Sequence, residues 1–290
     1  MTQEVRWERM FPDQLEAAFV AKPLVWFAYG LCEPHGPQNT LGLDALKAHA
    51  LCVRAAEAHG GIVAPPDYWH IHEIGHYAVW AHANVGEGRT WLSCVPPWVH
   101  FKNVLYHLRM AEVHGFHAAV LVTGHYGPNY RDLKKLVEYW QPHFALKFYG
   151  LPDFEANLNQ QADHAGYVET SQLWALEPAC VDITRLPQPP APKPNFATGG
   201  DAYKANRRDG EKMIAYQVDW LGKKAAELLG AYSPSAGTRK PKSYADVEAL
   251  WAKTQADLLP KLESMQELLG KDEPVPEISR WHLNFHVPKL

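Results

Sequence analysis

The sequence predicts an α/β fold in which a mainly parallel sheet is sandwiched by helices on both faces. Short apolar runs alternate along the chain with longer stretches whose apolar residues recur at helical spacing. The 290 residues are 47% hydrophobic and 21% charged, which is enough for a sizeable core. Apolar runs are followed within a few residues by His, Glu or Asp, at the positions where open α/β sheets build their sites.

The elements are predicted from their periodicity. Strands are expected near 23–29, 61–65, 118–123 and 144–149, and helices near 44–59, 97–114, 129–140 and 167–176. The proline-rich run 186–194 predicts a stiff extended connector, with a ligand for another protein as the alternative. A last amphipathic helix near 208–229 closes the core.

The chain is expected to divide into a core domain, 1–232, and a C-terminal helical and extended addition, 233–290. A second amphipathic stretch runs from Ser243 to about Leu269, and Pro260 should kink or split it. Its Leu and Trp side chains need cover. We expect a neighbouring subunit to supply it, with a partner protein as the alternative.

The segment after the first predicted strand places Glu33, His35 and Asp44 close together in the chain. If the backbone stays extended, Glu33 and His35 point to opposite sides, so that a pair of metals could use both more easily than one metal could. Asp44 begins a predicted helix, and an ordinary helix cap is its alternative role.

Two further segments supply candidate ligands. His125 follows the strand near 118–123, where a hydrogen-bonded structural histidine is the alternative. Glu169 lies at the start of a predicted helix, which can direct its carboxylate toward a cation, while His164 on the preceding loop is free to move protons. The alternative is that Glu169 is an ordinary carboxylate of the first helical turn and that His164 is a loop residue with no catalytic role.

Together these segments resemble the creatininase (creatinine amidohydrolase) family. The resemblance rests on three motifs in order: the Glu33-x-His35-Gly36 loop followed by Asp44, the Gly124-His125 turn ending in Asn129, and His164-x-Gly-x-x-Glu169-Thr-Ser171. It spans roughly Val25 to Leu229. It implies the sandwiched parallel sheet and a hexameric homo-oligomer, since relatives are commonly hexamers.

The resemblance also implies a centre of two divalent metal ions. In this implied centre Asp44 bridges the two ions. Glu33 and His125 hold one ion, and His35 and Glu169 hold the other. A metal-bridging hydroxide would attack the carbonyl carbon of an amide, and His164 would pass a proton to the departing nitrogen. Two imidazoles and three carboxylates suit zinc, manganese or iron.

The chain departs from the family at two positions near this centre. Creatininase uses a Glu two residues after the turn histidine, whereas this chain has Gly127, so Glu169 is assigned as ligand instead. Creatininase closes over creatinine with a Trp where this chain has Gln160, and an amide cannot supply that stacking face. Gln160 is therefore expected on the substrate side. Tyr126 matches a family position beside the substrate, with packing in the core as its alternative role.

The histidine-rich run 70–82 is interpreted as a substrate loop or subunit contact, with a third metal site as the alternative. The four cysteines have no Cys-x-x-Cys spacing and are expected to be reduced thiols. Cys32 adjoins the first ligand loop, and a redox-sensitive role is its alternative.

Composition excludes several classes of function. A formal charge of −4 without long Lys/Arg runs argues against nucleic-acid binding. The sequence contains no apolar run of about 18 residues, so no membrane span is predicted. The first ten residues lack the apolar core of a signal peptide. A cytoplasmic location is expected.

The predicted function is a metal-dependent amidohydrolase that cleaves a C–N bond of a small-molecule amide, lactam or formamide. The alternatives are a non-catalytic metal- or ligand-binding member of the fold and a peptidase-like member of the family.

Overall fold

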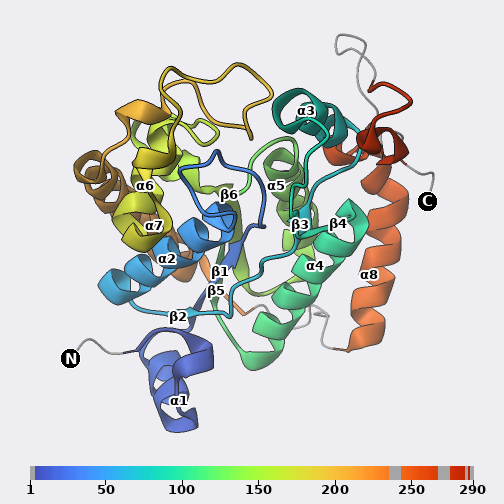
Figure 1. Ribbon diagram of the computed structural model, residues 1–290. Coiled ribbons are helices and arrows are strands. Elements are labelled where there is room, and N and C mark those ends of the chain that lie inside the picture. Colours follow the sequence, from blue (N-terminus) through green and yellow to red (C-terminus); the bar gives the residue numbers. More distant parts are fainter. Residues whose placement is uncertain (1–3, 235–242, 267–274, 285–286, 288–290) are drawn as a thin grey trace.

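The core of the computed structural model is a four-stranded, fully parallel sheet with strand order β2-β1-β5-β6 (Figure 1). The structure describes residues 4–234, 243–266, 275–284 and 287. The strands are β1 (Leu24–Tyr29), β2 (Ile62–Val63), β5 (Ala118–Thr123) and β6 (Lys147–Pro152). The predicted fold class is confirmed.

Helices cover both faces of this sheet, and the side chains of β1 show how. Val25, Phe27 and Tyr29 enter one hydrophobic core, which they share with α4 (Pro97–His114) and α5 (Asn129–Trp140). Leu24 and Trp26 enter the other, shared with α2 (Leu43–His59), α6 (Tyr167–Leu176) and α7 (Arg207–Ala231). Alternate residues of a strand point to opposite faces, so one uniformly apolar strand serves two cores.

The predicted helices near 97–114, 129–140 and 167–176 have the observed ends of α4, α5 and α6. Three features were not predicted: α1 (Pro12–Ala21), α3 (His76–Val85) and a separate parallel pair of short strands, β3 (His70–Ile71) and β4 (Cys94–Val95). The connector 186–194 contains no helix or strand. The short 3-10 turns are η1 (Trp7–Arg9), η2 (Gln141–His143), η3 (Asp153–Ala156), η4 (Leu158–Gln160), η5 (Pro178–Cys180), η6 (Ile183–Arg185), η7 (Ala202–Lys204), η8 (Leu259–Lys261), η9 (Glu263–Met265) and η10 (Arg280–Asn284).

The C-terminal addition packs on its own chain. Helix α8 (Tyr244–Asp257) buries Val247, Leu250 and Trp251 in the core that contains α4 and α5. The expectation that a neighbouring subunit covers this stripe is therefore wrong. Pro260 lies in η8, after the end of α8 at Asp257, so the amphipathic stretch is split near this proline as predicted. Residues 267–269 of the predicted stretch lie outside the described residues.

Within the described part of the chain, no helix combines the length and the apolar character needed to cross a bilayer.

Candidate metal centre

Five candidate ligands meet at the carboxyl ends of β1 and β5. Glu33 and His35 lie on the loop that follows β1, and His125 follows β5. Asp44 is in the first turn of α2, and Glu169 is in the first turn of α6. All five residues are buried. The parallel sheet brings them together, because its strands end at one edge and its helices begin there.

The ligand atoms form two groups that share one carboxylate. Glu33, Asp44 and His125 have ligand atoms within 4.8 Å of one another, and so have His35, Asp44 and Glu169. Oδ1 of Asp44 lies 3.1 Å from Nε2 of His35, and Oδ2 lies 3.1 Å from Nδ1 of His125. Each Asp44 oxygen thus faces a different imidazole, which is the arrangement that a bridging carboxylate needs.

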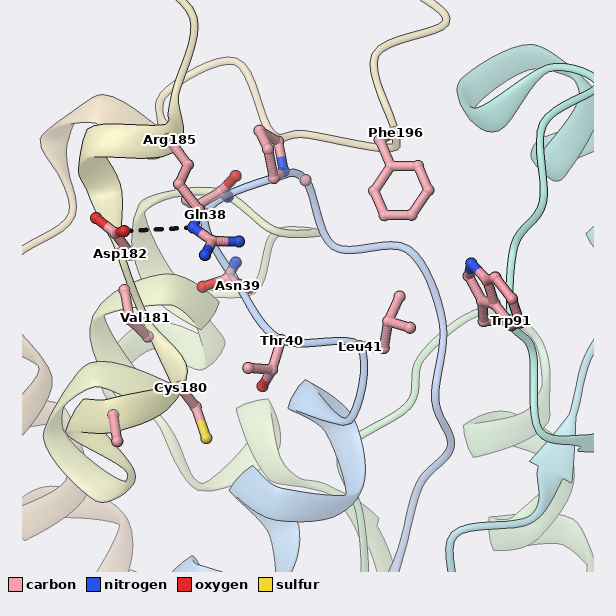
Figure 2. Close-up of a pocket in the computed structure, with 13 residues that line it drawn as sticks. Gln38, Asn39, Thr40, Leu41, Trp91, Cys180, Val181, Asp182, Arg185 and Phe196 are labelled. Carbon is pink, nitrogen blue, oxygen red and sulfur yellow. Dashed lines mark hydrogen bonds and ion pairs between the residues drawn. The ribbon is translucent and has the colours of Figure 1, made fainter.

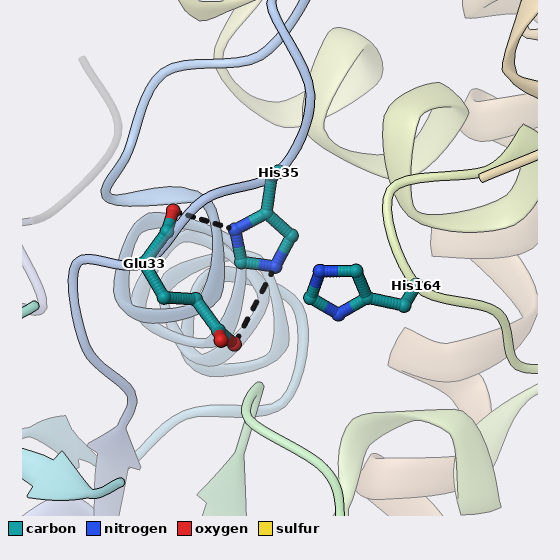
Figure 3. Close-up of side chains that lie close together, drawn as sticks. All are labelled: Glu33, His35 and His164. Carbon is teal, nitrogen blue, oxygen red and sulfur yellow. Dashed lines mark hydrogen bonds and ion pairs between the residues drawn. The ribbon is translucent and has the colours of Figure 1, made fainter. Parts of the chain in front are cut away.

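A third group contains Glu33, His35 and His164. The rings of His35 and His164 are stacked with centroids 4.4 Å apart, and Figure 3 shows the two imidazoles side by side with Glu33 across from them. Glu33 and His35 therefore converge on one group, and the opposite directions expected for an extended backbone do not apply. The reason is local: β1 ends at Tyr29, so the loop that carries them is not extended strand.

The cluster has a strong negative potential. Burial alone would lower the pKa of His35, but Asp44, Glu33 and Glu169 outweigh it and raise the pKa to about 9. Burial likewise opposes the effect of Glu33 and Asp44 on His125, whose pKa is raised to about 10. Three carboxylates that hold protons on imidazoles this firmly would also attract a cation.

Several buried polar atoms of the cluster have no well-aligned hydrogen bond among the described residues, although they lie next to one another. These atoms are Glu33 Oε2, His35 Nε2, Asp44 Oδ2 and His72 Nε2. Glu33 Oε2, for example, lies 3.2 Å from His72 Nε2. Carboxylate oxygens and imidazole nitrogens are ligands for zinc, manganese and iron, so the donor set fits divalent metal ions.

A buried lysine that the sequence analysis missed supports Glu169. Nζ of Lys47 lies 2.8 Å from Oε1 of Glu169, 3.0 Å from Oδ2 of Asp153 and 2.7 Å from the hydroxyl of Tyr126. Burial alone would raise the pKa of Glu169, but Lys47, His35 and His164 outweigh it and lower the pKa. Lys47 follows Asp44 by three residues, so the two share a helix face, which was the available signal.

A cavity of about 130 Å³ opens onto the cluster. Its lining joins Glu33, His125 and His164 to side chains of the histidine-rich run and of the turn after β5: His72, His76, Tyr77, Trp80, Tyr126 and Gly127. The run predicted as a substrate loop or subunit contact thus supplies one wall, and much of that wall is helix α3.

The two residues expected on the substrate side differ in placement. Tyr126 lines the cavity, while its hydroxyl donates to Asp153 Oδ1 at 2.6 Å and accepts from Lys47. Only its ring is left for a ligand. Gln160 is exposed in η4 and is not among the residues that line this cavity.

A larger cavity, about 880 Å³, lies on the other side of the loop after His35. Figure 2 shows it between residues 36–41 and the turn that carries Asp182 and Arg185, with Trp91 and Phe196 across from them. Arg185 pairs there with Asp182 at 3.3 Å. The lining of this larger cavity includes none of the five candidate ligands, whereas Glu33 and His125 line the smaller one.

Two glycines allow the strand ends to touch the first turn of α2. A Cβ on Gly124 would lie 2.2 Å from the carbonyl oxygen of Asp44, and one on Gly30 would lie 2.4 Å from the amide nitrogen of Ala45. Neither distance is sterically possible. The backbone of Asp44 is therefore held between two positions that admit no side chain.

Comparison with known proteins gives one family. The sequence model described as creatininase, creatinine amidohydrolase, matches residues 8–225. A solved structure titled "Creatininase Mn" has 20% identity and a TM-score of 0.59, covering 80% of this chain and 100% of its own. A creatinine amidohydrolase structure has 19% identity and a TM-score of 0.60 over the same shares. A mutant creatininase complexed with creatine has 20% identity and a TM-score of 0.59, covering 77% of this chain and 98% of its own. No curated protein matches the chain significantly.

Proposed function

Because the chain belongs to the creatininase family, we propose that it is a metal-dependent amidohydrolase that cleaves a C–N bond of a small amide, lactam or formamide. The observation that carries the proposal is the position of Asp44, whose two oxygens face two imidazoles in two ligand groups. We assign one ion to Glu33, Asp44 and His125, and a second to His35, Asp44 and Glu169.

The metals of two solved relatives support this assignment. One relative is titled as a manganese form and another as a "Zn-Zn type" creatininase. When bound, a pair of divalent ions lowers the pKa of a water and polarises a carbonyl. The charges of Glu33, Asp44 and Glu169 would offset most of the charge of two such ions.

His164 is the proposed proton carrier. Its Nε2 donates to the carbonyl oxygen of Pro34 at 3.1 Å, which leaves Nδ1 unprotonated and able to accept a proton. Burial, and then the neighbouring imidazole of His35, lower the pKa of His164. A neutral imidazole at neutral pH can take a proton from water and then donate it to the leaving nitrogen.

The size of the cavity favours a small substrate. At about 130 Å³ it is below the roughly 300–1,000 Å³ of pockets for drug-sized ligands. A peptidase needs room for an extended chain on both sides of the scissile bond. Trp80 and Tyr77 instead bound the space next to His125 and His164.

The first test combines elemental analysis with hydrolysis of lactams, formamides and short peptides. We expect two divalent ions per chain and release of ammonia or amine from small amides but not from peptides. The His164→Ala variant should keep both ions and lose about 100-fold or more in kcat. The exposed His114 gives a matched control, His114→Ala, which should behave as the parent protein.

The outcomes separate the alternatives. If His164→Ala loses an ion, His164 is a ligand of the third group and not a proton carrier. Two bound ions without hydrolysis of any amide would favour the non-catalytic alternative. Hydrolysis of peptides alone would favour the peptidase-like one.

We also propose a homo-oligomer, a hexamer by family resemblance, in a reducing compartment such as the cytoplasm. Trp69 and Trp91 are 58% and 61% exposed and offer apolar surface for such contacts. All four cysteines are free. Light scattering of the purified protein would give its mass, and a monomer would contradict the proposed assembly.

A further inference from the structure

The C-terminal addition reaches the wall of the small cavity through helix α3. Three residues of α3 line that cavity: His76, Tyr77 and Trp80. Ala78 and Ala81 are fully buried on another face of the helix, in a cluster with Val275 and Trp281. Helix α3 therefore lies between the cavity and a segment beyond the family match, which ends at residue 225.

The apolar contact is close because the residues of α3 are small. Trp281 is 1% exposed, and its indole packs on the two alanines. Its Nε1 donates to the carbonyl oxygen of Gly86, the C-cap of α3, at 2.8 Å. Among the described elements, α3 makes its main contacts with η10, the turn that carries Trp281.

Polar contacts fix the end of α3. Ser279 Oγ donates to Glu87 Oε1 at 2.6 Å, and the amide of Arg280 donates to Glu87 Oε2 at 3.0 Å. The guanidinium of Arg280 donates to the carbonyl oxygen of Gly88 at 2.7 Å. Among the described residues, the segment after α3 thus has four hydrogen bonds to the addition, including that of Trp281 to Gly86.

The start of α3 is held as well. Arg280 Nη2 lies 3.8 Å from Glu73 Oε1, before the helix. A Cβ on Gly75, the N-cap, would lie 2.9 Å from the carbonyl oxygen of Gln266, so the addition abuts the backbone there. No side chain caps this end, and an isolated ten-residue helix is marginal in water.

The position of α3 decides what the cavity can hold. The ring of Trp80 meets that of His164 edge to face, with centroids 4.7 Å apart, and lies 5.9 Å from that of His72. A shift of α3 away from the cluster would separate Trp80 from His164 and enlarge the space beside the candidate ligands.

We propose that the segment Val275–Leu283 is a specificity-determining support, which holds α3 against the metal centre and keeps the cavity small enough to select small amides. The selection of amides rests on the proposed function; the support of α3 does not. Trp281 and Glu87 are positioning residues, since neither lines the cavity.

The test compares Trp281→Ala with Trp251→Ala in the same full-length protein. Both replace a buried tryptophan of the addition, but Trp251 packs in the core with α4 and does not belong to the cluster on α3. For Trp281→Ala we expect amide hydrogen exchange in Tyr77–Val85 to rise about 10-fold or more. Carbethoxylation of His164 by diethyl pyrocarbonate should accelerate relative to exposed His114, with bound metal unchanged.

The kinetic arm measures KM and kcat for a small and a bulky amide. Trp281→Ala should raise KM for the small amide about 10-fold and change its kcat by less than about threefold. The ratio of kcat/KM for the bulky amide to kcat/KM for the small amide should rise. Glu87→Ala, at an exposed side chain that threatens folding little, should move each readout in the same direction to a smaller extent. Trp251→Ala should lower stability and leave these readouts unchanged.

The proposal is overturned if exchange in α3 and carbethoxylation of His164 do not change in Trp281→Ala, or change equally in Trp251→Ala. It is also overturned if α3 loosens while KM and the amide preference stay constant. If the parent protein hydrolyses no amide, the proposed function fails, while exchange and carbethoxylation still decide whether the addition holds the cavity wall.

Discussion

At the scale of single residues, Asp44 is the carboxylate shared by the two ligand groups to which we assign the ions. Asp44→Asn keeps the size of the side chain but removes its charge, and an amide nitrogen cannot coordinate a cation. We therefore expect the loss of both ions and a loss of activity of about 100-fold or more, the upper range for changes next to a metal. Elemental analysis measures the ions.

The matched control is Asp219→Asn, at an exposed position of α7, which should retain full metal content. If Asp44→Asn retained two tightly bound ions, a bridging role would be untenable.

Lys47 supports a prediction about stability. Lys47→Met leaves Asp153 and Glu169 buried without their cation, and breaking a buried pair in this way costs about 3–5 kcal/mol. Urea denaturation of the metal-free protein measures the free energy of unfolding. Adding Asp153→Asn to Lys47→Met should recover part of the loss, because one uncompensated charge is removed.

The control for Lys47 is Lys102→Met, which breaks the exposed pair with Glu248. It should cost at most about 1 kcal/mol. An equally small cost for Lys47→Met would show that the buried network is not needed for stability.

The sequence placed the five candidate ligands after predicted strands or at the starts of predicted helices, and the family resemblance then implied the ligand set. Lys47, Asp153 and His72 escaped prediction. A lysine in an amphipathic helix normally faces water, and only the fold shows that this one meets Asp153 from the end of β6. His72 belongs to a recognised histidine-rich run, but the spacing of that run does not tell which ring faces the cluster.

At the scale of elements, helix α4 contains a buried histidine that should make the protein sensitive to acid. Burial lowers the pKa of His100 to about 3, so the folded protein keeps it neutral. The unfolded chain binds a proton at this histidine below about pH 6.5, whereas the folded protein does not. The contribution of His100 to the free energy of unfolding is therefore fully present above about that pH and is lost as the pH falls toward about 3. This decline amounts to about 2 kcal/mol between pH 6.5 and pH 5.

His100→Asn tests this effect, since its amide is neutral at every pH and can still donate to the carbonyl oxygen of Trp69. The free energy of unfolding of the variant should fall less steeply between pH 6.5 and pH 5 than that of the parent protein. Parallel curves would exclude His100 as a source of the acid sensitivity.

Helix ends were predicted well where amphipathic spacing stops at a clear signal, as at Pro97 and Gly115 of α4. The last strand was predicted near 144–149 but β6 spans 147–152. The apolar run starts early because Phe144 and Leu146 bury their side chains in the core before strand pairing begins. The pattern of apolar residues indicates which side chains are buried, and here buried side chains begin before the first backbone hydrogen bonds between β6 and β5.

At the scale of the whole molecule, the C-terminal addition is part of the core. Trp251 is 4% exposed in the cluster that contains α4 and α5. Trp251→Ala should therefore lower the free energy of unfolding by about 3–5 kcal/mol. Lys253→Ala, exposed on the same helix, should change it by less than about 0.5 kcal/mol. Similar denaturation midpoints for the two variants would contradict this packing.

The fold class was predictable because alternating strands and helices leave few topologies for a parallel sheet. The position of α8 was not predictable, because an amphipathic helix must bury its apolar side but its sequence does not indicate against which surface. A sequence that ends in such a stripe is equally consistent with a subunit contact.

The contacts of Gly30 and Gly124 with the first turn of α2 have a consequence for laboratory evolution. In a saturation library, both codons should tolerate almost no replacement, although neither encodes a reactive group. A search for new substrates would gain more by varying Trp80, which lines the cavity and, unlike Tyr77, has no hydroxyl bonded to the turn after β5.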